Sequence, residues 1–186
     1  MPHQILRFDS PERFVAGTVG EPGQRTFFLQ VREGSQIVTV LLEKEQVAAL
    51  AQRMDALLDE VVRRTGGQAP VPVTAPADLD DTAPLEQPIE EEFRVGTLTL
   101  AWDGTEDQVV IEAFAAADED VLQPDSQIPE GRDVLVVRIS GAAARAFVKR
   151  AEALVSAGRP PCPLCALPLD PEGHICPRQN GYRRRD

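Results

Sequence analysis

The chain has 186 residues, 42% of them hydrophobic, which is enough for one large domain or two small ones with a buried core. Its net charge of −11, from 30 acidic and 19 basic residues, argues against nucleic acid or anionic lipid as a partner for most of the surface. No apolar run approaches the length of a transmembrane helix and the N-terminus lacks a signal segment, so we expect a cytoplasmic protein.

Residues 1–65 are predicted to form a β-meander followed by one helix. A short strand is expected at 4–8, and three longer β-branched or aromatic runs occupy 13–19, 25–31 and 36–43. Because turns at hairpin spacing separate these runs, an antiparallel meander is expected. The helix is indicated by one apolar stripe with a period of 3.6 residues, made of Val47, Leu50, Ala51, Met54, Leu57, Leu58 and Val61.

Residues 66–89 are rich in proline, alanine and aspartate and poor in large apolar side chains. This composition is typical of an extended, mobile linker. We interpret the segment as a surface connection without a function of its own.

Residues 90–158 are predicted to form a second meander and helix. The expected strands are 92–98, 109–115 and 133–140, and an acidic loop at 118–132 precedes the last of them. The second helical stripe consists of Ala144, Phe147, Val148, Ala151, Leu154 and Val155.

The two meander-plus-helix units resemble each other, which indicates an internal duplication. Their openings align Phe14, Gly17 and Thr18 with Phe93, Gly96 and Thr97. An offset of 97 residues superposes the helical stripes and places Arg53 on Arg150. Matched stripes alone would align any two amphipathic helices, so the hypothesis depends on the openings. We predict an α+β protein in which two related antiparallel units pack together with pseudo-two-fold symmetry.

Residues 159–186 contain the cluster that indicates a defined chemistry, namely Cys162, Cys165, His174 and Cys176. Thiolates and imidazole are the ligands that structural zinc prefers. Four protein ligands fill a tetrahedron and leave no position for water, so the predicted Zn²⁺ is structural. In the Cys-x2-Cys pair the intervening amides are expected to turn towards the sulfurs. The unit is predicted to be a small zinc-ribbon-like knuckle followed by a basic tail.

Free or redox-active thiols are one alternative for this cluster, and a catalytic metal or iron is another. A redox Cys-x2-Cys pair is expected at a helix N-terminus in a βαβ unit, whereas this pair follows Arg-Pro-Pro in a loop. Three cysteines cannot all form disulfides, and disulfides are rare in the cytosol. Both considerations favour zinc.

The remaining polar groups indicate no catalytic set. Phosphate-binding glycine loops and a GxSxG motif are absent from the sequence. Arg25 is a candidate anion ligand, and the acidic runs at 90–92 and 118–120 are Mg²⁺ or acid–base candidates that we expect to be solvated. The arginines at 183–185 form either a flexible tail or a contact to phosphate, RNA or an acidic partner.

Three stretches of the chain resemble an uncharacterised actinobacterial family, domain of unknown function 3090. These stretches are SPERFVAGTVGEPGQRTFFLQ, VTVLLEKEQVAALAQRMDALLDEV and CPLCALPLDPEGHICPRQNGYRR. The resemblance covers nearly the whole chain. It implies a cytoplasmic bacterial protein of about this length, and it transfers no catalytic residue or metal ligand.

The sequence therefore favours a zinc-stabilised binding or adaptor protein that has an unknown protein partner. The alternative is an enzyme that processes a small molecule or nucleotide in a cleft between the two units. A third hypothesis is nucleic-acid contact through the basic tail.

Overall fold

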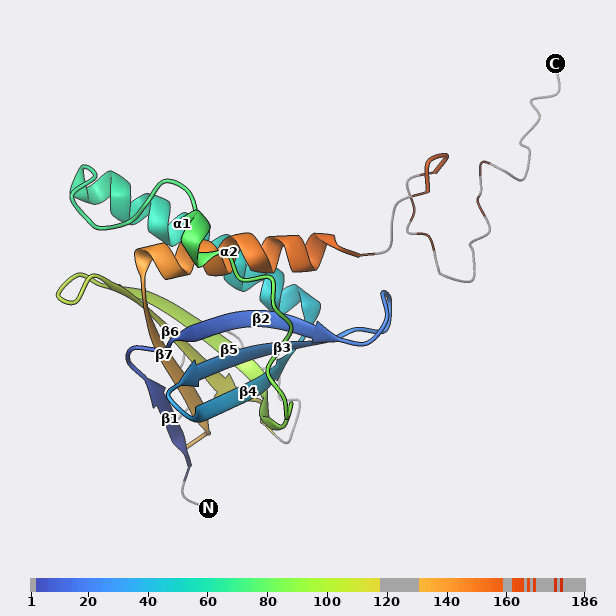
Figure 1. Ribbon diagram of the computed structural model, residues 1–186, viewed down its shortest axis with the longest axis horizontal. Coiled ribbons are helices and arrows are strands. Elements are labelled where there is room, and N and C mark those ends of the chain that lie inside the picture. The colour runs from blue at the N-terminus through green and yellow to red at the C-terminus, as the bar shows by residue number, and fades with distance from the viewer. Residues whose placement is uncertain are drawn as a thin grey trace.

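The computed structural model describes residues 3–117 and 131–158, together with residues 162–165, 167, 169, 176 and 178. Within these residues seven strands form one mixed sheet, and two long helices cross each other above it (Figure 1). The expected α+β class is confirmed. The two predicted meanders, however, are joined in a single sheet. No described helix is long and apolar enough to span a bilayer.

The first meander begins after the short strand β1 (Ile5–Phe8). Its elements are β2 (Arg13–Val19), β3 (Thr26–Glu33), β4 (Gln36–Leu42) and helix α1 (Lys44–Thr65). The helix begins at a capping box, in which the Gln46 side chain accepts a hydrogen bond of 2.8 Å from the Glu43 amide. It ends at Gly66, whose φ of 60° gives the left-handed residue that terminates many helices.

The second meander repeats this order and is followed by a shorter helix. Its elements are β5 (Glu91–Asp103), β6 (Gln108–Ala115), β7 (Val134–Ser140) and α2 (Gly141–Ser156). The Ser140 hydroxyl caps α2 by accepting a hydrogen bond of 3.1 Å from the Ala143 amide. Ser140 lies 97 residues after Glu43, which is the offset that superposes the two helical stripes.

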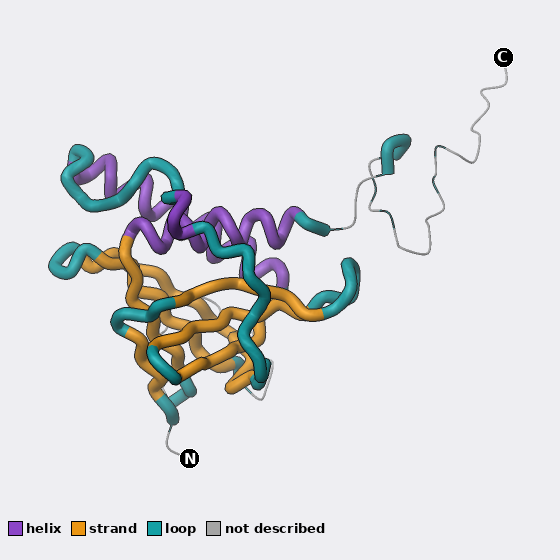
Figure 2. Tube along the Cα trace, in the orientation of Figure 1, coloured by secondary structure: helices purple, strands orange, loops and turns teal. Residues whose placement is uncertain are grey.

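The strand order is β1-β7-β6-β5-β4-β3-β2. Two of the pairings are parallel, and they join segments that lie far apart in the sequence. β4 pairs with β5, which joins the two meanders, and β1 pairs with β7 at the far side. Residues 9–12 alone connect β1 to β2, although these strands are at opposite edges of the sheet. Since such a short connection spans less than about 20 Å, the sheet curls and brings its edges towards each other (Figure 2).

The register of the sheet allows a second alignment of the two meanders. One row of the first meander pairs Thr18 with Phe27 and Phe27 with Leu42. One row of the second pairs Trp102 with Val109 and Val109 with Ile139. Leu42 and Ile139 lie 97 residues apart, which is the offset of the helical stripes. Aligned on these rows, Thr18 lies opposite Trp102, whereas the alignment of the openings places it opposite Thr97. The internal duplication stays a prediction.

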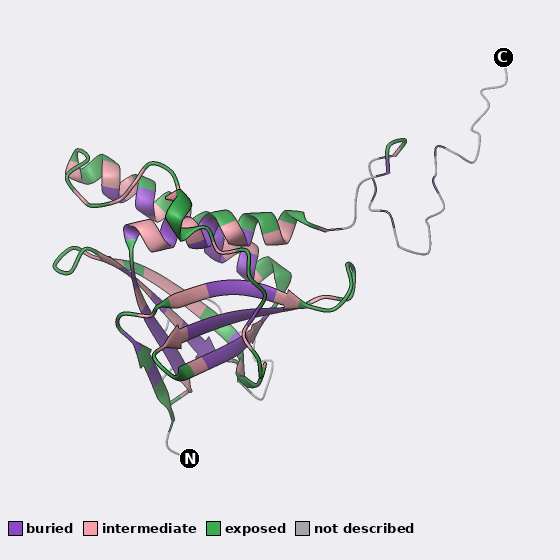
Figure 3. Ribbon diagram, in the orientation of Figure 1, coloured by how far each residue is buried: buried purple, intermediate pink, exposed green. Residues whose placement is uncertain are grey.

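The main core lies between the helices and the facing side of the sheet (Figure 3). The predicted stripe of α1 is confirmed, because all of its residues are buried except Leu57, which is half-buried. In α2, Ala144, Phe147, Val148 and Ala151 are buried, and Leu154 and Val155 pack at the margin of the core. Helical periodicity thus identifies the packed faces of both helices.

The segment 66–89, expected as a mobile linker, contacts the body of the protein at several points. Residues 80–86, here called the strap, cross from α2 over the edge strand β2 to the outer face of the sheet (Figure 1). Leu85 is 6% exposed there and packs with Val15 and Phe28. Burial of this leucine explains why a segment of polar composition follows the surface closely.

A carboxylate between two arginines holds the other end of the strap. Asp81 accepts hydrogen bonds from Arg13 Nε at 2.6 Å and from Arg150 at 2.9 Å. The Arg13 hydrogen bond holds the pKa of Asp81 below its usual value, although partial burial opposes this shift. The amide of Ala83 and the charge of Arg150 lower this pKa further.

The division of the chain into units at 1–65, 66–89, 90–158 and 159–186 stays a prediction.

Candidate functional site

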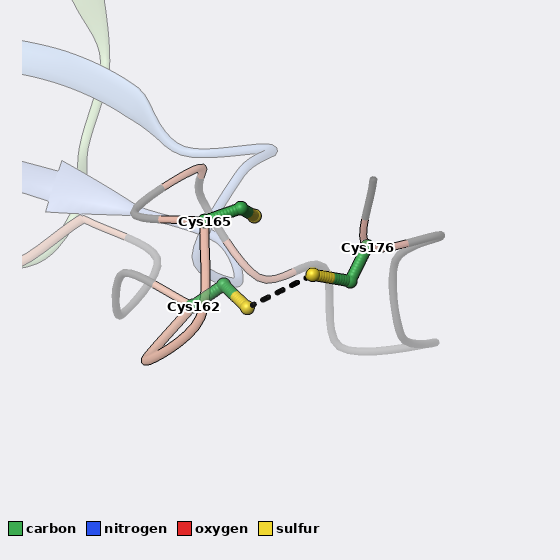
Figure 4. Close-up of side chains that lie close together, drawn as sticks. All are labelled: Cys162, Cys165 and Cys176. Atoms are coloured by element: carbon green, nitrogen blue, oxygen red, sulfur yellow. Dashed lines mark hydrogen bonds between the residues drawn. The ribbon is translucent and has the colours of Figure 1, made fainter. Parts of the chain in front are cut away.

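The three cysteines converge at one point near the C-terminus. Their sulfur atoms lie within 4.8 Å of one another, and those of Cys162 and Cys176 are 3.8 Å apart (Figure 4). Cys162 and Cys176 are buried, and Cys165 is half-buried. His174, the fourth predicted ligand, lies outside the described residues, so its role stays a prediction.

Backbone hydrogen bonds shape the Cys-x2-Cys turn. The amides of Leu164 and Cys165 donate to the sulfur of Cys162, and the amide of Leu167 donates to the sulfur of Cys165. The amide of Cys162 donates to the carbonyl of Leu167 at 2.7 Å and closes the loop. The intervening amides therefore turn towards the sulfurs, as the sequence predicts.

The same contacts shift the pKa values of Cys162 and Cys165 in opposite directions. Burial raises the pKa of Cys162, but the amides of Cys165 and Leu164 and the two neighbouring thiols together lower it below its usual value. Burial is also the main reason that the pKa of Cys165 is raised, and the neighbouring thiols add to it. These contacts therefore favour the thiolate of Cys162 over that of Cys165.

The sulfur positions fit a thiolate-bound metal. A tetrahedral zinc with Zn–S bonds of about 2.3 Å requires sulfur atoms about 3.8 Å apart, and Cys162 and Cys176 show this separation. A disulfide requires about 2.05 Å. Soft ligands suit zinc or another thiophilic ion, so the three clustered cysteines are compatible with a metal site.

A second candidate site is a groove of about 710 Å³ between α1 and β5. Leu50, Arg53 and Leu57 line it from the helix, and Leu98 and Leu100 line it from the strand. The groove exists because β4 pairs with β5 only as far as Leu41 and Arg94. Beyond that point a bulge at residue 96 directs β5 away from β4 and from the helix that follows β4.

The ionisable groups of this groove are few. Arg53 is exposed and makes no hydrogen bond or ion pair with another described residue. Glu60, at one end, forms ion pairs with Arg63 and Arg64. Hydrogen bonds from these two arginines hold the pKa of Glu60 below its usual value, so this carboxyl group is ionised at neutral pH.

The other candidates from the sequence lie elsewhere. Arg25 lies over the ring of Phe27, 5.5 Å from its centroid, and lines a separate hollow of about 470 Å³ with Lys44 and Glu45. The carboxylates at 90–92 are exposed at the start of β5 or just before it. Residues 118–120 and 183–185 lie outside the described residues. Neither Arg25 nor the carboxylates at 90–92 line the α1–β5 groove.

Sequence reasoning missed the groove because its apolar residues belong to patterns that ordinarily indicate a core. Leu57 belongs to the predicted stripe, and Leu98 and Leu100 alternate with threonines along a strand. The one feature of the sequence that pointed to the groove was Arg53, which the helical offset of 97 residues aligns with Arg150. The alignment alone does not show that the two arginines have different contacts.

Comparison with known proteins identifies a family but no activity. The model of the family "Protein of unknown function (DUF3090)" matches residues 6–176. The comparisons with curated proteins and with solved structures gave no significant match. Because the match includes nearly the whole sheet, both helices and all three cysteines, the chain belongs to the DUF3090 family of proteins of unknown function.

Proposed function

We propose that this protein is a zinc-stabilised binding protein whose metal is structural. The observation that carries the proposal is the convergence of three cysteine sulfurs within 4.8 Å. Cys162, Cys165 and Cys176 would supply three ligands and His174 the fourth. Such a set leaves no coordination position for a substrate. The ion would hold the C-terminal segment in one conformation and take no part in a reaction.

The proposal includes an internal duplication, supported by the order and direction of the strands. Each meander runs through three antiparallel strands into a helix that is capped at its first turn. The two parallel pairings, β4 with β5 and β7 with β1, occupy corresponding places in this scheme. We infer that β1 and β2 together correspond to the single long strand β5.

The α1–β5 groove supports binding rather than catalysis. Its charged lining residues are Arg53 and Glu60, and Glu60 is held ionised by its own arginine partners. General acid–base catalysis at neutral pH needs a group with a pKa near 7 in contact with the substrate. Among the described residues the groove offers no such group, but it offers apolar area and one cation without a partner.

Metal analysis of the purified full chain tests the structural site. We expect one zinc per chain and its loss in the Cys165→Ser variant. Substitution by cobalt should give the visible spectrum of a four-coordinate site with three thiolates, and the His174→Ala variant should change that spectrum. Absence of bound metal, or a cobalt spectrum that shows an exchangeable water ligand in the wild type, would overturn the structural assignment.

Binding requires its own test. The full chain, with zinc bound, should retain one partner in a stoichiometric complex when recovered from cells that produce it at native level. The Cys165→Ser variant is the comparison that shows whether the metal segment contributes to the contact. Recovery of the chain alone, with its zinc in place, would contradict a binding role.

The enzymatic alternative uses the same groove, and one observation favours it. A volume of about 710 Å³ lies within the usual range of small-molecule sites, about 300–1,000 Å³. A thermal-shift screen with phosphorylated and carboxylated metabolites, followed by turnover assays on any ligand found, distinguishes the two. Conversion of a ligand would establish an enzyme, and saturable binding without conversion would support a binding protein.

A further inference from the structure

We propose that the α1–β5 groove binds an extended acidic peptide segment of a partner protein, with Arg53 contacting a carboxylate of that segment. The inference deepens the proposed binding function and rests on it. It depends on a comparison within the molecule, because the surface that corresponds to the groove is closed between α2 and β2.

The corresponding surface lies between α2 and β2. With the helices offset by 97 residues and the long strands by 84, as Thr18 and Trp102 require, Leu50 and Leu98 correspond to Phe147 and Phe14. The rings of Phe14 and Phe147 stack with their centroids 4.8 Å apart. This pair fills the space between α2 and β2. The smaller leucines leave the equivalent space between α1 and β5 open.

The two corresponding arginines differ in the same way. Arg150 donates hydrogen bonds of 2.8 Å to the carbonyl of Ala16 and 2.9 Å to the Asp81 carboxylate. It also donates a hydrogen bond of 2.8 Å to the carbonyl of Ala83. Arg150 is thus bound by an extended stretch of its own chain that carries an aspartate. Arg53 occupies the equivalent position on α1 and has no partner among the described residues.

The edge of β5 provides the means to hold an extended chain. The pairing of β5 with β4 ends at Arg94, and the carbonyls of Val95 and Gly96 accept hydrogen bonds from the Gln46 side chain. From residue 97 onwards, β6 is the one described strand that pairs with β5. A strand edge without a neighbour presents backbone groups that an added peptide strand is able to pair with. Residues 96–100 line the groove, and five residues of strand span about 16 Å. That length accommodates four or five residues of an extended peptide.

Charge selects the kind of peptide. Two charged residues line the groove among those described: Glu60, whose charge is paired with Arg63 and Arg64, and Arg53, which has no such partner. Leucine side chains from α1 and β5 make most of the walls apolar. A carboxylate next to aliphatic side chains complements this lining, whereas a basic peptide would leave two cations facing each other. The strap combines a carboxylate and an aliphatic side chain in the same way: Arg150 binds Asp81, and Leu85 packs on the outer face of the sheet.

The test is selection from a display library of random ten-residue peptides on the full, zinc-loaded chain. We expect the wild type to enrich peptides that combine Asp or Glu with an aliphatic residue. The Arg53→Glu variant should lose these peptides at least tenfold and enrich basic ones instead. The Lys44→Glu variant makes the same charge change on the same helix outside the groove, and it should select as the wild type does.

Two further measurements locate the binding. A selected peptide should slow amide hydrogen exchange in residues 97–103 of β5, and not in β2. The double variant Leu50→Phe with Leu98→Phe recreates the stacked pair that lies between α2 and β2. It should fold, keep its zinc and lose the peptide. An exchange-protected edge other than β5, or full binding by the double variant, would overturn the proposal.

A small carboxylate is the competing occupant, and decanoate serves as its probe. If decanoate binds in an Arg53-dependent manner while the library yields no peptide, the groove is a small-molecule site and the proposal is wrong. Failure of the peptide selection in a protein with one bound zinc overturns this inference alone. A chain that is purified without bound metal and still selects these peptides overturns the metal assignment alone.

Discussion

At the scale of single residues, Gly17 and Leu85 form a close contact between the sheet and the strap. A Cβ atom added at Gly17 would lie 2.5 Å from Cγ and Cδ2 of Leu85. Contacts this short force the leucine to move, so the strap has access to its present position only because residue 17 has no side chain. The outer face of the first meander therefore selects glycine through packing, without a requirement for positive φ.

We predict that Gly17→Ala lowers the free energy of unfolding by about 1–2 kcal/mol and that Leu85→Ala lowers it by about 2–3 kcal/mol. The double variant should be no less stable than Leu85→Ala alone, because the shortened side chain leaves room for the new methyl group. Urea denaturation of the three variants measures this. Strictly additive losses would show that the two residues do not share the contact.

The strap should also respond to acid through Asp81. Its pKa is lowered in the folded protein, chiefly by the hydrogen bond from Arg13. The stabilisation is therefore complete above the unfolded-state pKa, about 3.9, and is lost as the pH falls through the lower folded-state value. We expect the methyl NMR signals of Leu85 to shift below about pH 4. In Asp81→Asn they should resemble the acid form at every pH.

At the scale of secondary-structure elements, one buried arginine connects the two helices. The side chain of Arg145 in α2 is 7% exposed, forms an ion pair with Asp55, and contacts Asp59 of α1 at 2.6 Å. Its Nε donates a hydrogen bond of 3.0 Å to the carbonyl of Pro72. These contacts satisfy the guanidinium and fix the start of α2 against the second half of α1 and the segment that follows it.

We predict that Arg145→Ala lowers the free energy of unfolding by about 1–3 kcal/mol, a range below that of fully buried pairs because both carboxylates are partly exposed. Lysine should restore less than half of the loss, since it cannot donate to both carboxylates and the carbonyl in one plane. Thermal and urea unfolding provide the measurement. A stability equal to that of the wild type in Arg145→Ala would contradict a connecting role.

The elements themselves were largely predictable from the sequence, whereas their pairing was not. Periodicity identified the buried faces of both helices, and the hairpin spacing identified each meander, because these are local interactions. The parallel pairing of Thr39 with Glu91, and that of Ile5 with Val134, joins segments far apart in the chain. The composition of these strands does not specify that β4 pairs with β5 or that β1 pairs with β7.

The candidate site was predictable to the extent that it depends on local spacing. The cysteines were identified because ligands close in sequence can surround one ion. The groove was not identified, because it depends on which side chains fill the space between α1 and β5 and the corresponding space between α2 and β2. Two phenylalanines close the first space and two leucines leave the second open. That difference becomes meaningful only when the sheet register shows which residues correspond.

At the scale of the whole molecule, the described cysteines of the proposed metal segment lie outside the main core of the body. Cys162 and Cys176 are buried, yet neither belongs to the main hydrophobic core between the helices and the sheet. The core contacts of α1 and α2 with the strands involve residues up to Val155. The body therefore has its own source of stability.

We predict that removal of zinc by a chelator leaves the midpoint of thermal unfolding of the body within about 2 °C of its original value, a shift that corresponds to less than about 1 kcal/mol for a domain of this size. Amide exchange in residues 162–176 should accelerate strongly. Calorimetry and exchange measured by mass spectrometry check both statements. Unfolding of the sheet on chelation would show that the metal segment is integral to the core.

The pairing of β1 with β7 has a consequence for synthesis on the ribosome. The partner of Ile5, Val134, is translated roughly 130 residues after it, which takes roughly 6–26 seconds at about 5–20 residues per second. During that interval Leu6 and Phe8, which the finished protein buries, have no β7 to pair with. They form a short apolar segment that stays exposed on the nascent chain until β7 is made.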